Sequence, residues 1–255
     1  MTEKVKNVLL PLCFGILIIA IWQLGFIHAA LGFKPFQLPV PSQIVITLRD
    51  NFAKTMFDTV ITVSAALTGL ILGCAIGFLI AVIATMFPKW GYSVLSIIAA
   101  VNAIPIVALS PIMNRWFTDG FSQKVGVVTV VCLAAMSINA YRGLNDLRPF
   151  AKDLLESYAA SGRVIFLKLR LPNCLPSVFT ALKINVAAAV MAAMISEYFS
   201  ASTSGIGFGI KDNLRKGIMA KGWSYIVVAA VVGIILYLIV MMIERRVIKW
   251  HASQR

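Results

Sequence analysis

The chain has 255 residues, of which 60% are hydrophobic and 13% are charged. Soluble globular proteins contain about 45–50% apolar and about 25% charged residues, so the composition argues against a soluble protein and for segments that cross a membrane. The formal net charge of +13 would suit a nucleic-acid-binding protein, but the basic residues lie between apolar runs, where they orient a membrane chain, and no nucleic-acid partner is predicted.

The first predicted span covers residues 8–27. Lys4 and Lys6 precede this run, so the segment could also be a signal peptide, in which basic residues precede an apolar core. That core is about 7–15 residues long in signal peptides, and the run here is longer. We therefore interpret it as a retained transmembrane helix.

A short amphipathic helix is predicted next, over residues 42–56. Three prolines precede it, and Ser42 is the expected N-cap. Ile44, Leu48 and Phe52 recur every four residues, so one apolar face would lie along the membrane interface. This segment is predicted to lie on the membrane surface and not to span it.

The second span covers residues 59–86. Gly69, Gly73 and Gly77 recur in it at four-residue spacing, which forms a ridge of small residues that lets another helix approach closely. The partner helix belongs either to the same subunit or to a second copy of the chain. We favour packing within one subunit.

Four further spans follow, and the third span of the chain is expected to be broken at Pro105 and Pro111. Six spans place both termini on one side of the membrane. With the termini inside, 13 of the 23 basic residues are cytoplasmic and 9 lie outside, a modest bias in favour of cytoplasmic termini. The four remaining spans are 93–113, 125–140, 178–195 and 225–243.

The stretch 149–176 is polar, basic and patterned as a helical hairpin. A first helix is predicted over 149–161 and ends at Gly162, and a second over 164–171 is closed by Pro172. A helical hairpin that projects from a membrane domain suits a groove on another protein. The alternative is a solvated loop that only connects two spans.

Residues 153–176 resemble the cytoplasmic motif of permeases in bacterial ATP-binding cassette (ABC) importers, E-A-A-x-x-x-G followed by I-x-L-P. We place Asp153 at the Glu position and Ala159 at the Gly position; the register that uses Glu156 and Gly162 leaves Leu-Pro three residues too early. Because Ala replaces the family's Gly, Gly162 is expected to take over its turn. The resemblance implies that the ATPase-coupling residues are Asp153, Leu154, Leu155, Glu156, Tyr158, Ala159, Ala160, Ser161, Gly162, Leu171 and Pro172.

Three other segments, 38–48, 103–124 and 196–210, resemble the nitrate, sulfonate and taurine branch of these permeases. That branch also includes importers of pyrimidine vitamin precursors and of riboflavin. Thr118-Asp119 departs from its W-F-G-x-G pattern. By this resemblance the residues of the translocation path or outer gate are Pro105, Pro111, Arg115, Trp116, Glu197, Gly205 and Gly207.

The resemblance implies an all-α integral membrane protein with six transmembrane helices and the type I ABC importer permease fold, in the bacterial cytoplasmic membrane. Its partners would be a second copy of the chain, two ATP-binding cassette subunits, an extracytoplasmic substrate-binding protein and the lipid bilayer. The chain itself is predicted to bind no cofactor, because ATP and magnesium belong to the ATPase.

No catalytic or metal site is predicted within the chain. Gly205-x-Gly207 lacks the preceding strand and the following Gly-Lys-Ser/Thr of a phosphate loop, and no Ser/His/Asp arrangement is visible. The four cysteines have neither C-x-x-C spacing nor a neighbouring His cluster. The sequence therefore predicts a protein that is not an enzyme.

Two other classes stay open: a secondary transporter or channel, and a membrane assembly factor. Proton-coupled carriers keep ionisable residues at mid-membrane, whereas Lys183 and Glu197 lie near the ends of one span and are expected to snorkel or cap. The predicted cargo is a small anion such as a sulfonate or nitrate, because basic residues outnumber acidic ones near the outer mouth. A pyrimidine-type nutrient is the alternative, since aromatic residues such as Trp116 and Phe117 would border its passage.

Overall fold

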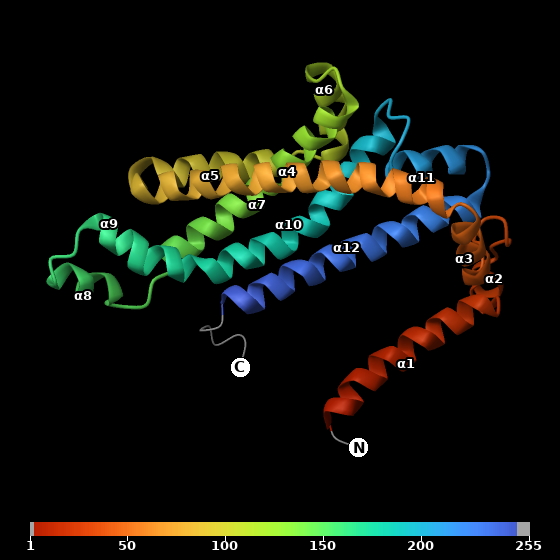
Figure 1. The fold of residues 1–255 in the computed structure, drawn as a ribbon, viewed down its shortest axis with the longest axis horizontal. Helices are drawn as coiled ribbons and strands as arrows, with labels where there is room; N and C mark the ends of the chain where they lie inside the picture. Colours follow the sequence, from red (N-terminus) through yellow and green to blue (C-terminus); the bar gives the residue numbers. More distant parts are fainter. Residues whose placement is uncertain (1–2, 249–255) are drawn as a thin grey trace.

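The structure is a computed structural model that describes residues 3–248, and every regular element in that range is helical. Helices α4, α5, α7, α10 and α12 run along the longest axis, with α8 and α9 at one end and α3 and α11 at the other, while α1 lies obliquely apart from them (Figure 1). The helices are α1 (Glu3–Gln23), α2 (Phe26–Leu31), α3 (Pro41–Asp50), α4 (Phe52–Met86), α5 (Pro88–Asn102), α6 (Ile106–Trp116), α7 (Gly120–Asn145), α8 (Ala151–Ser157), α9 (Gly162–Ile165), a π-helical turn (Phe166–Arg170), α10 (Leu171–Phe199), α11 (Ile206–Arg215) and α12 (Met219–Val247).

Within residues 3–248, four helical segments are long and apolar enough to cross a membrane: α4, α7, the run from α9 through α10, and α12. They contain the second, fourth, fifth and sixth predicted spans. The bent pair of α5 and α6 forms a fifth if it counts as one span, and the apolar part of α1, Leu9–Gln23, is shorter. The count of six therefore stays a prediction.

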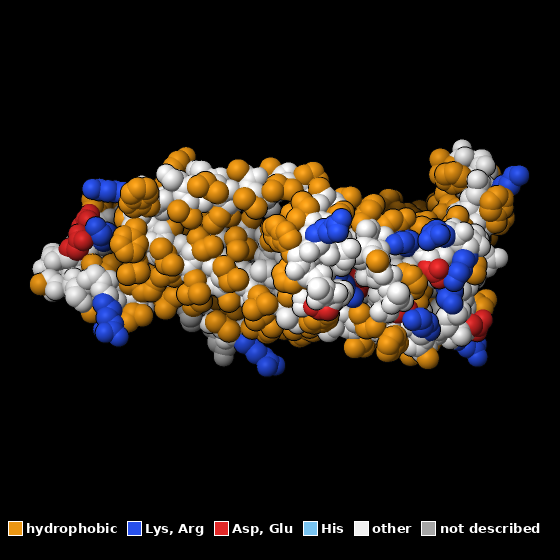
Figure 2. Space-filling view, turned by 90° about the horizontal axis from the view of Figure 1, so that it is seen from above, with side chains coloured by type: hydrophobic (Ala, Val, Ile, Leu, Met, Phe, Trp, Pro, Cys, Tyr) orange, Lys and Arg blue, Asp and Glu red, His pale blue; other side chains and the backbone are white. Residues whose placement is uncertain are grey.

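Side chains are distributed along the long axis as a membrane requires. In Figure 2 the middle of the visible face is covered by hydrophobic side chains, while Lys, Arg, Asp and Glu gather at the hairpin end and over the opposite third. An apolar belt between two charged ends suits a chain whose long axis crosses the bilayer. We call the end with α8 and α9 the hairpin end, and the end with α3 and α11 the far end.

The core lies where α4, α7 and α10 pack together. A Cβ atom on Gly69, Gly73 or Gly77 would overlap atoms of α7, among them side-chain atoms of Val128 and Cys132. The ridge of small residues therefore packs against α7 of the same chain, as predicted. At this contact the backbones of α4 and α7 approach each other directly, without large side chains between them. Only glycine permits so close an approach, because any Cβ atom would overlap the facing helix.

The third predicted span is broken at one proline and not at two. Between α5 and α6 the axis turns by 96°, and Pro105 lies at the N-terminal end of α6. Pro105 lacks an N–H, so it suits the first turn of a helix, where that group has no partner. Pro111 lies inside α6, so the break expected there is wrong.

The predicted surface helix is shorter than expected and is capped differently. It covers α3 only, because Asn51 separates Asp50 from the start of α4. Pro41 is its first residue, which leaves Ser42 inside the helix. The prediction of Ser42 as N-cap is wrong: its backbone N–H donates to Gln23 Oε1 at 3.0 Å and its Oγ accepts from Gln23 Nε2 at 3.0 Å.

The chain ends of α1 and α12 both point toward the hairpin end in Figure 1. The outermost residues, 1–2 and 249–255, lie outside the described range, so the cytoplasmic placement of the termini stays a prediction. Near the hairpin end Lys183 of α10 donates to both oxygens of Glu244 in α12, at 2.9 and 3.0 Å. Lys183 therefore pairs with an acidic residue of α12 within the bundle.

Candidate functional site

The hairpin is built from α8 and α9, joined by a turn at Ala159. The backbone of Ala159 has φ +54°, in the left-handed region that glycine adopts most easily. In the preferred register Ala159 occupies the position of the family's glycine. The turn therefore lies where that register predicts it, although the residue there carries a Cβ.

Two details of the predicted hairpin are wrong. Gly162 begins α9 and does not end the preceding helix, which already stops at Ser157, so Gly162 has not taken over the turn. Pro172 does not close a second helix, because the chain continues as one helical run from Gly162 to Phe199. A proline inside an α-helix clashes with the carbonyl four residues earlier, and the wider π-helical turn Phe166–Arg170 lies directly before Leu171-Pro172.

The hairpin exposes large apolar side chains. Phe150 is 80% exposed, Tyr158 76% and Leu154 57%, and Phe150 also has a left-handed backbone with φ +63°. Lys152 and Glu156 form an exposed ion pair at 3.0 Å, which contributes little to stability. Of the predicted coupling residues, Leu155 and Ala160 are half-buried, and Asp153, Glu156, Ser161 and Gly162 are exposed.

Polar contacts fasten the base of the hairpin to the end of α7. Arg170 donates to Leu144 O at 3.0 Å and to Asn145 Oδ1 at 2.7 Å. Asn173 donates through one amide nitrogen to Gly143 O and Asp146 O, both at 2.9 Å. These bonds satisfy carbonyl groups at a helix end, and they attach the hairpin rigidly to the membrane-spanning bundle.

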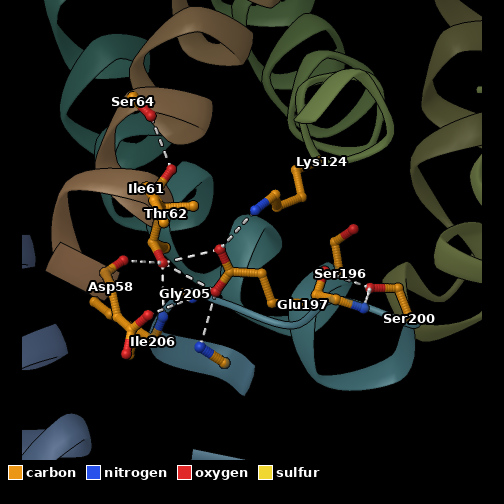
Figure 3. Close-up of polar contacts among 12 residues, drawn as sticks. Asp58, Ile61, Thr62, Ser64, Lys124, Ser196, Glu197, Ser200, Gly205 and Ile206 are labelled. Atoms are coloured by element: carbon orange, nitrogen blue, oxygen red, sulfur yellow. Dashed lines mark hydrogen bonds and ion pairs between the residues drawn. The ribbon is translucent and has the colours of Figure 1, made fainter. Parts of the chain in front are cut away.

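At the far end, Glu197 of α10 is fully buried and is the centre of a polar network (Figure 3). It accepts hydrogen bonds from Thr62 Oγ1 of α4 at 2.9 Å, from Lys124 Nζ of α7 at 3.2 Å and from the Gly207 N–H of α11 at 2.8 Å. Four helices are thus joined through one carboxylate. Glu197 is buried and so does not snorkel, but by accepting the Gly207 N–H it caps the first turn of α11.

Asp58 of α4 is a second buried carboxylate in this region. It accepts from Tyr225 Oη of α12 at 2.7 Å, from the Gly205 N–H at 3.0 Å and from Lys54 Nζ at 3.0 Å. Gly205 has φ +109°, and a Cβ there would overlap the Glu197 carboxylate. Only glycine fits at this position, which explains the first glycine of the G-x-G motif.

Gly207 is buried for a related reason. A Cβ there would overlap the carbonyl of Met194, so the start of α11 lies directly against α10. Gly205, Gly207 and Glu197 thus belong to the packed interior of the far end. The other predicted path residues, Pro105, Pro111, Arg115 and Trp116, lie on or beside α6 and are exposed, Trp116 by 70%.

Sequence reasoning missed Asp58, Thr62, Lys124 and Tyr225. Asp58 directly precedes the predicted span 59–86, Tyr225 begins the span 225–243, and Lys124 directly precedes the span 125–140, so each lies where hydropathy predicts a membrane boundary. The sequence did contain one signal: Glu197 and Lys124 carry opposite charges and each lies at the far end of a predicted span, so they suit a buried ion pair. The sequence does not show which helices meet at that end, because this depends on the tertiary structure.

The profile of a family described as "binding-protein-dependent transport system inner membrane component" matches residues 69–249, more than half of the chain. The chain belongs to this family. The permease is 27% identical to the formylaminopyrimidine transport permease protein ThiX of Halalkalibacterium halodurans, over 96% of both chains. It is 24% identical to the putative aliphatic sulfonates transport permease protein SsuC of Bacillus subtilis, over 97% of this chain and 88% of that one.

A solved structure of an amino acid ABC transporter superposes with a TM-score of 0.63 at 12% identity, over 79% of this chain and 98% of that chain. At this identity the likeness concerns the fold alone. The predicted family and the predicted all-α fold of an ABC importer permease are confirmed. The permease is thus an inner-membrane transport component.

Proposed function

We propose that the permease forms the translocation path of an ATP-driven importer. Two ATPase subunits bind at the hairpin end, a substrate-binding protein docks at the far end, and a second copy of the chain completes the path. ATP and magnesium are bound by the ATPase. Closure of the ATPase pair pushes on the hairpin and rocks the spans between inward and outward access.

The left-handed turn at Ala159 is the observation that carries this proposal. It lies at the glycine position of the E-A-A-x-x-x-G motif, beside apolar side chains that are exposed on α8. Exposed large apolar groups on a rigid hairpin suit a protein groove, whereas a connecting loop has no need of them. Contacts from Arg170 and Asn173 would carry a push on the hairpin into α7 and α10.

A secondary transporter is the competing class, and the structure offers it little support. The ionisable side chains Glu197, Asp58 and Lys183 are each bonded to a partner within the bundle. Copurification with an ATPase subunit, and uptake into proteoliposomes that requires ATP, test the proposal. Uptake without ATP, driven by a proton gradient, would contradict it.

The proposed topology places the hairpin inside the cell and the loop 200–205 outside. We expect single cysteines at Ser161 and Ser202, each in a variant without native cysteines, to label from opposite sides of the membrane. Ser161 is exposed and Ser202 is half-buried. An impermeant maleimide applied to intact cells and to inverted vesicles measures this. Labelling of both positions in intact cells would refute the topology.

For the cargo we propose a small heteroaromatic nutrient of the pyrimidine type. The sequence predicted an anion from the basic residues at the far end, but two of their side chains are already paired, Lys124 with Glu197 at 3.2 Å and Lys216 with Asp212 at 2.6 Å. Exposed Trp116 and Phe117 remain on or next to α6. The relative ThiX is named as a formylaminopyrimidine permease, and SsuC as one for aliphatic sulfonates.

Calorimetry on the cognate binding protein distinguishes the two cargoes. We expect tight binding of formylaminopyrimidine and no heat from taurine, alkanesulfonates or nitrate. The opposite pattern would restore the anion prediction. The control is the same titration into binding protein that has been unfolded and refolded to remove any copurified ligand.

A further inference from the structure

We propose that a polar pocket at the far end is a contact site for the solute, and that it takes an uncharged, hydrogen-bonding edge of a small heterocycle. The inference rests on the proposed function and specifies its substrate class. The pocket has a volume of about 390 Å³, within the range of about 300–1,000 Å³ of small-molecule sites. Its polar lining includes Asn114, Thr118, Gln123, Lys124, Thr203 and Ser204.

The charge at the pocket wall is already neutralised. Among the residues that line the pocket, Lys124 is the one with a charged side chain, and its ammonium lies 3.2 Å from Glu197 Oε1 with 5% of the side chain exposed. An anion that drew Lys124 away would leave the Glu197 carboxylate buried without its counter-charge, which is costly. The pocket therefore does not offer an anion a free cation.

The N-terminus of α7 borders the same pocket, and the place where an anion could bind this helix end is already occupied by a carboxylate of the chain. Asp119 caps α7, and its carboxylate accepts the Ser122 N–H at 2.7 Å. This backbone hydrogen bond holds the pKa of Asp119 below its usual value, so the carboxylate is ionised at neutral pH. A negative charge at the helix N-terminus repels a second anion.

The remaining polar groups suit a neutral ligand. Hydroxyl and amide side chains both donate and accept hydrogen bonds, which matches the mixed donors and acceptors on the edge of an aminopyrimidine ring. Phe121 lines this pocket and also a second, mostly apolar pocket of about 500 Å³, to which Trp116 and Phe117 contribute. A flat ring would thus find aromatic faces directly beside the polar groups.

The first test measures occupancy through the protection of a cysteine. Thr203→Cys is introduced into a variant without native cysteines, and the permease is reconstituted with its ATPase and binding protein in proteoliposomes. We expect formylaminopyrimidine to slow labelling at this position by an impermeant maleimide by at least about threefold, and taurine and nitrate to have no effect. Lys216→Cys, exposed at the end of α11 and not part of the pocket lining, is the control and should label at one rate throughout.

The second test measures transport. Thr203→Val removes a hydroxyl at nearly constant volume, and we expect the KM for formylaminopyrimidine uptake to rise on the order of fivefold, the effect of one lost hydrogen bond. Ser64→Ala removes a hydroxyl from α4 outside the pocket and should leave KM unchanged. An unchanged KM in Thr203→Val together with unprotected Thr203→Cys overturns the proposal.

Two further outcomes separate this proposal from the proposed function. Protection of Thr203→Cys by unloaded binding protein alone, equal for all three probes, would make the pocket a protein docking site and overturn the solute contact. If the wild-type complex shows no ATP-dependent uptake of any probe, the proposed function fails. ATP-dependent uptake with the pocket variants unaffected refutes the pocket alone.

Discussion

Replacing Ala159 by Trp is expected to abolish ATP-driven uptake while the permease still inserts into the membrane. Ala159 has φ +54°, a conformation that costs an L-residue roughly 1–2 kcal/mol and that a bulky side chain tolerates poorly. An indole here would also project from the exposed turn, at the place where we propose that an ATPase groove binds. Copurification of the ATPase and uptake into proteoliposomes measure the effect.

Ala159→Gly is the matched control for this substitution. Glycine adopts the left-handed region without strain, so we expect the hairpin to be as stable as before or more stable, by up to about 1 kcal/mol, and uptake to be retained. Gly162→Ala should also be tolerated, since nothing lies within 4 Å of a Cβ there. Normal uptake by Ala159→Trp would place the coupling contact elsewhere.

Replacing Glu197 by Ala is expected to destabilise the permease by about 3–5 kcal/mol, the cost of leaving a buried partner charge uncompensated. Lys124 would lose its counter-ion while 4% exposed, and Thr62 and the Gly207 N–H would lose their acceptor. The melting temperature of the detergent-solubilised permease measures the loss.

A double-mutant cycle isolates the ion pair. Glu197→Gln and Lys124→Met should each lower the melting temperature strongly, whereas the double variant should lose less than the two single losses added together, because no unpaired charge remains. Gln keeps acceptor and donor groups near Thr62 and Gly207. Strictly additive losses would show that the two side chains do not depend on each other.

The apolar periodicity made much of the fold predictable. Runs of apolar residues located the helices, and the four-residue spacing of Gly69, Gly73 and Gly77 predicted a close helix contact, which the structure places against α7. Hydrophobic pattern and glycine spacing are local properties of the chain, so they can be interpreted without knowledge of the fold. The break at Pro105 was predictable for the same reason.

The buried far end was not predictable in this way. Asp58 and Glu197 lie 139 positions apart in the sequence, and hydropathy alone places each of them at a membrane boundary. Their burial depends on α11 folding back across α4 and α10, which requires the glycines at 205 and 207. Burying a charge is tolerated only where partners from other helices converge, and that convergence is a tertiary property.

The hairpin was predicted in outline and wrongly in detail. Glycine propensity suggested a turn at Gly162, but the turn lies at Ala159, where the chain accepts local strain. Proline propensity suggested a helix end at Pro172, but the π-helical turn before it lets the helix continue. At the base of the hairpin, Arg170 and Asn173 hold the continuous helix against the end of α7, a tertiary contact that local propensity does not reveal.

The uninterrupted helical run from Gly162 to Phe199 connects the hairpin to the far end of the bundle as one continuous element. Its 38 residues measure about 57 Å at the rise of an α-helix. One extremity carries the hairpin and the other carries Glu197, so a tilt of about 5° at the hairpin extremity would displace the opposite one by about 5 Å. That displacement exceeds the reach of a hydrogen bond, so a small rotation at the hairpin would suffice to break the contacts of Glu197 with Thr62 and Lys124 at the far end.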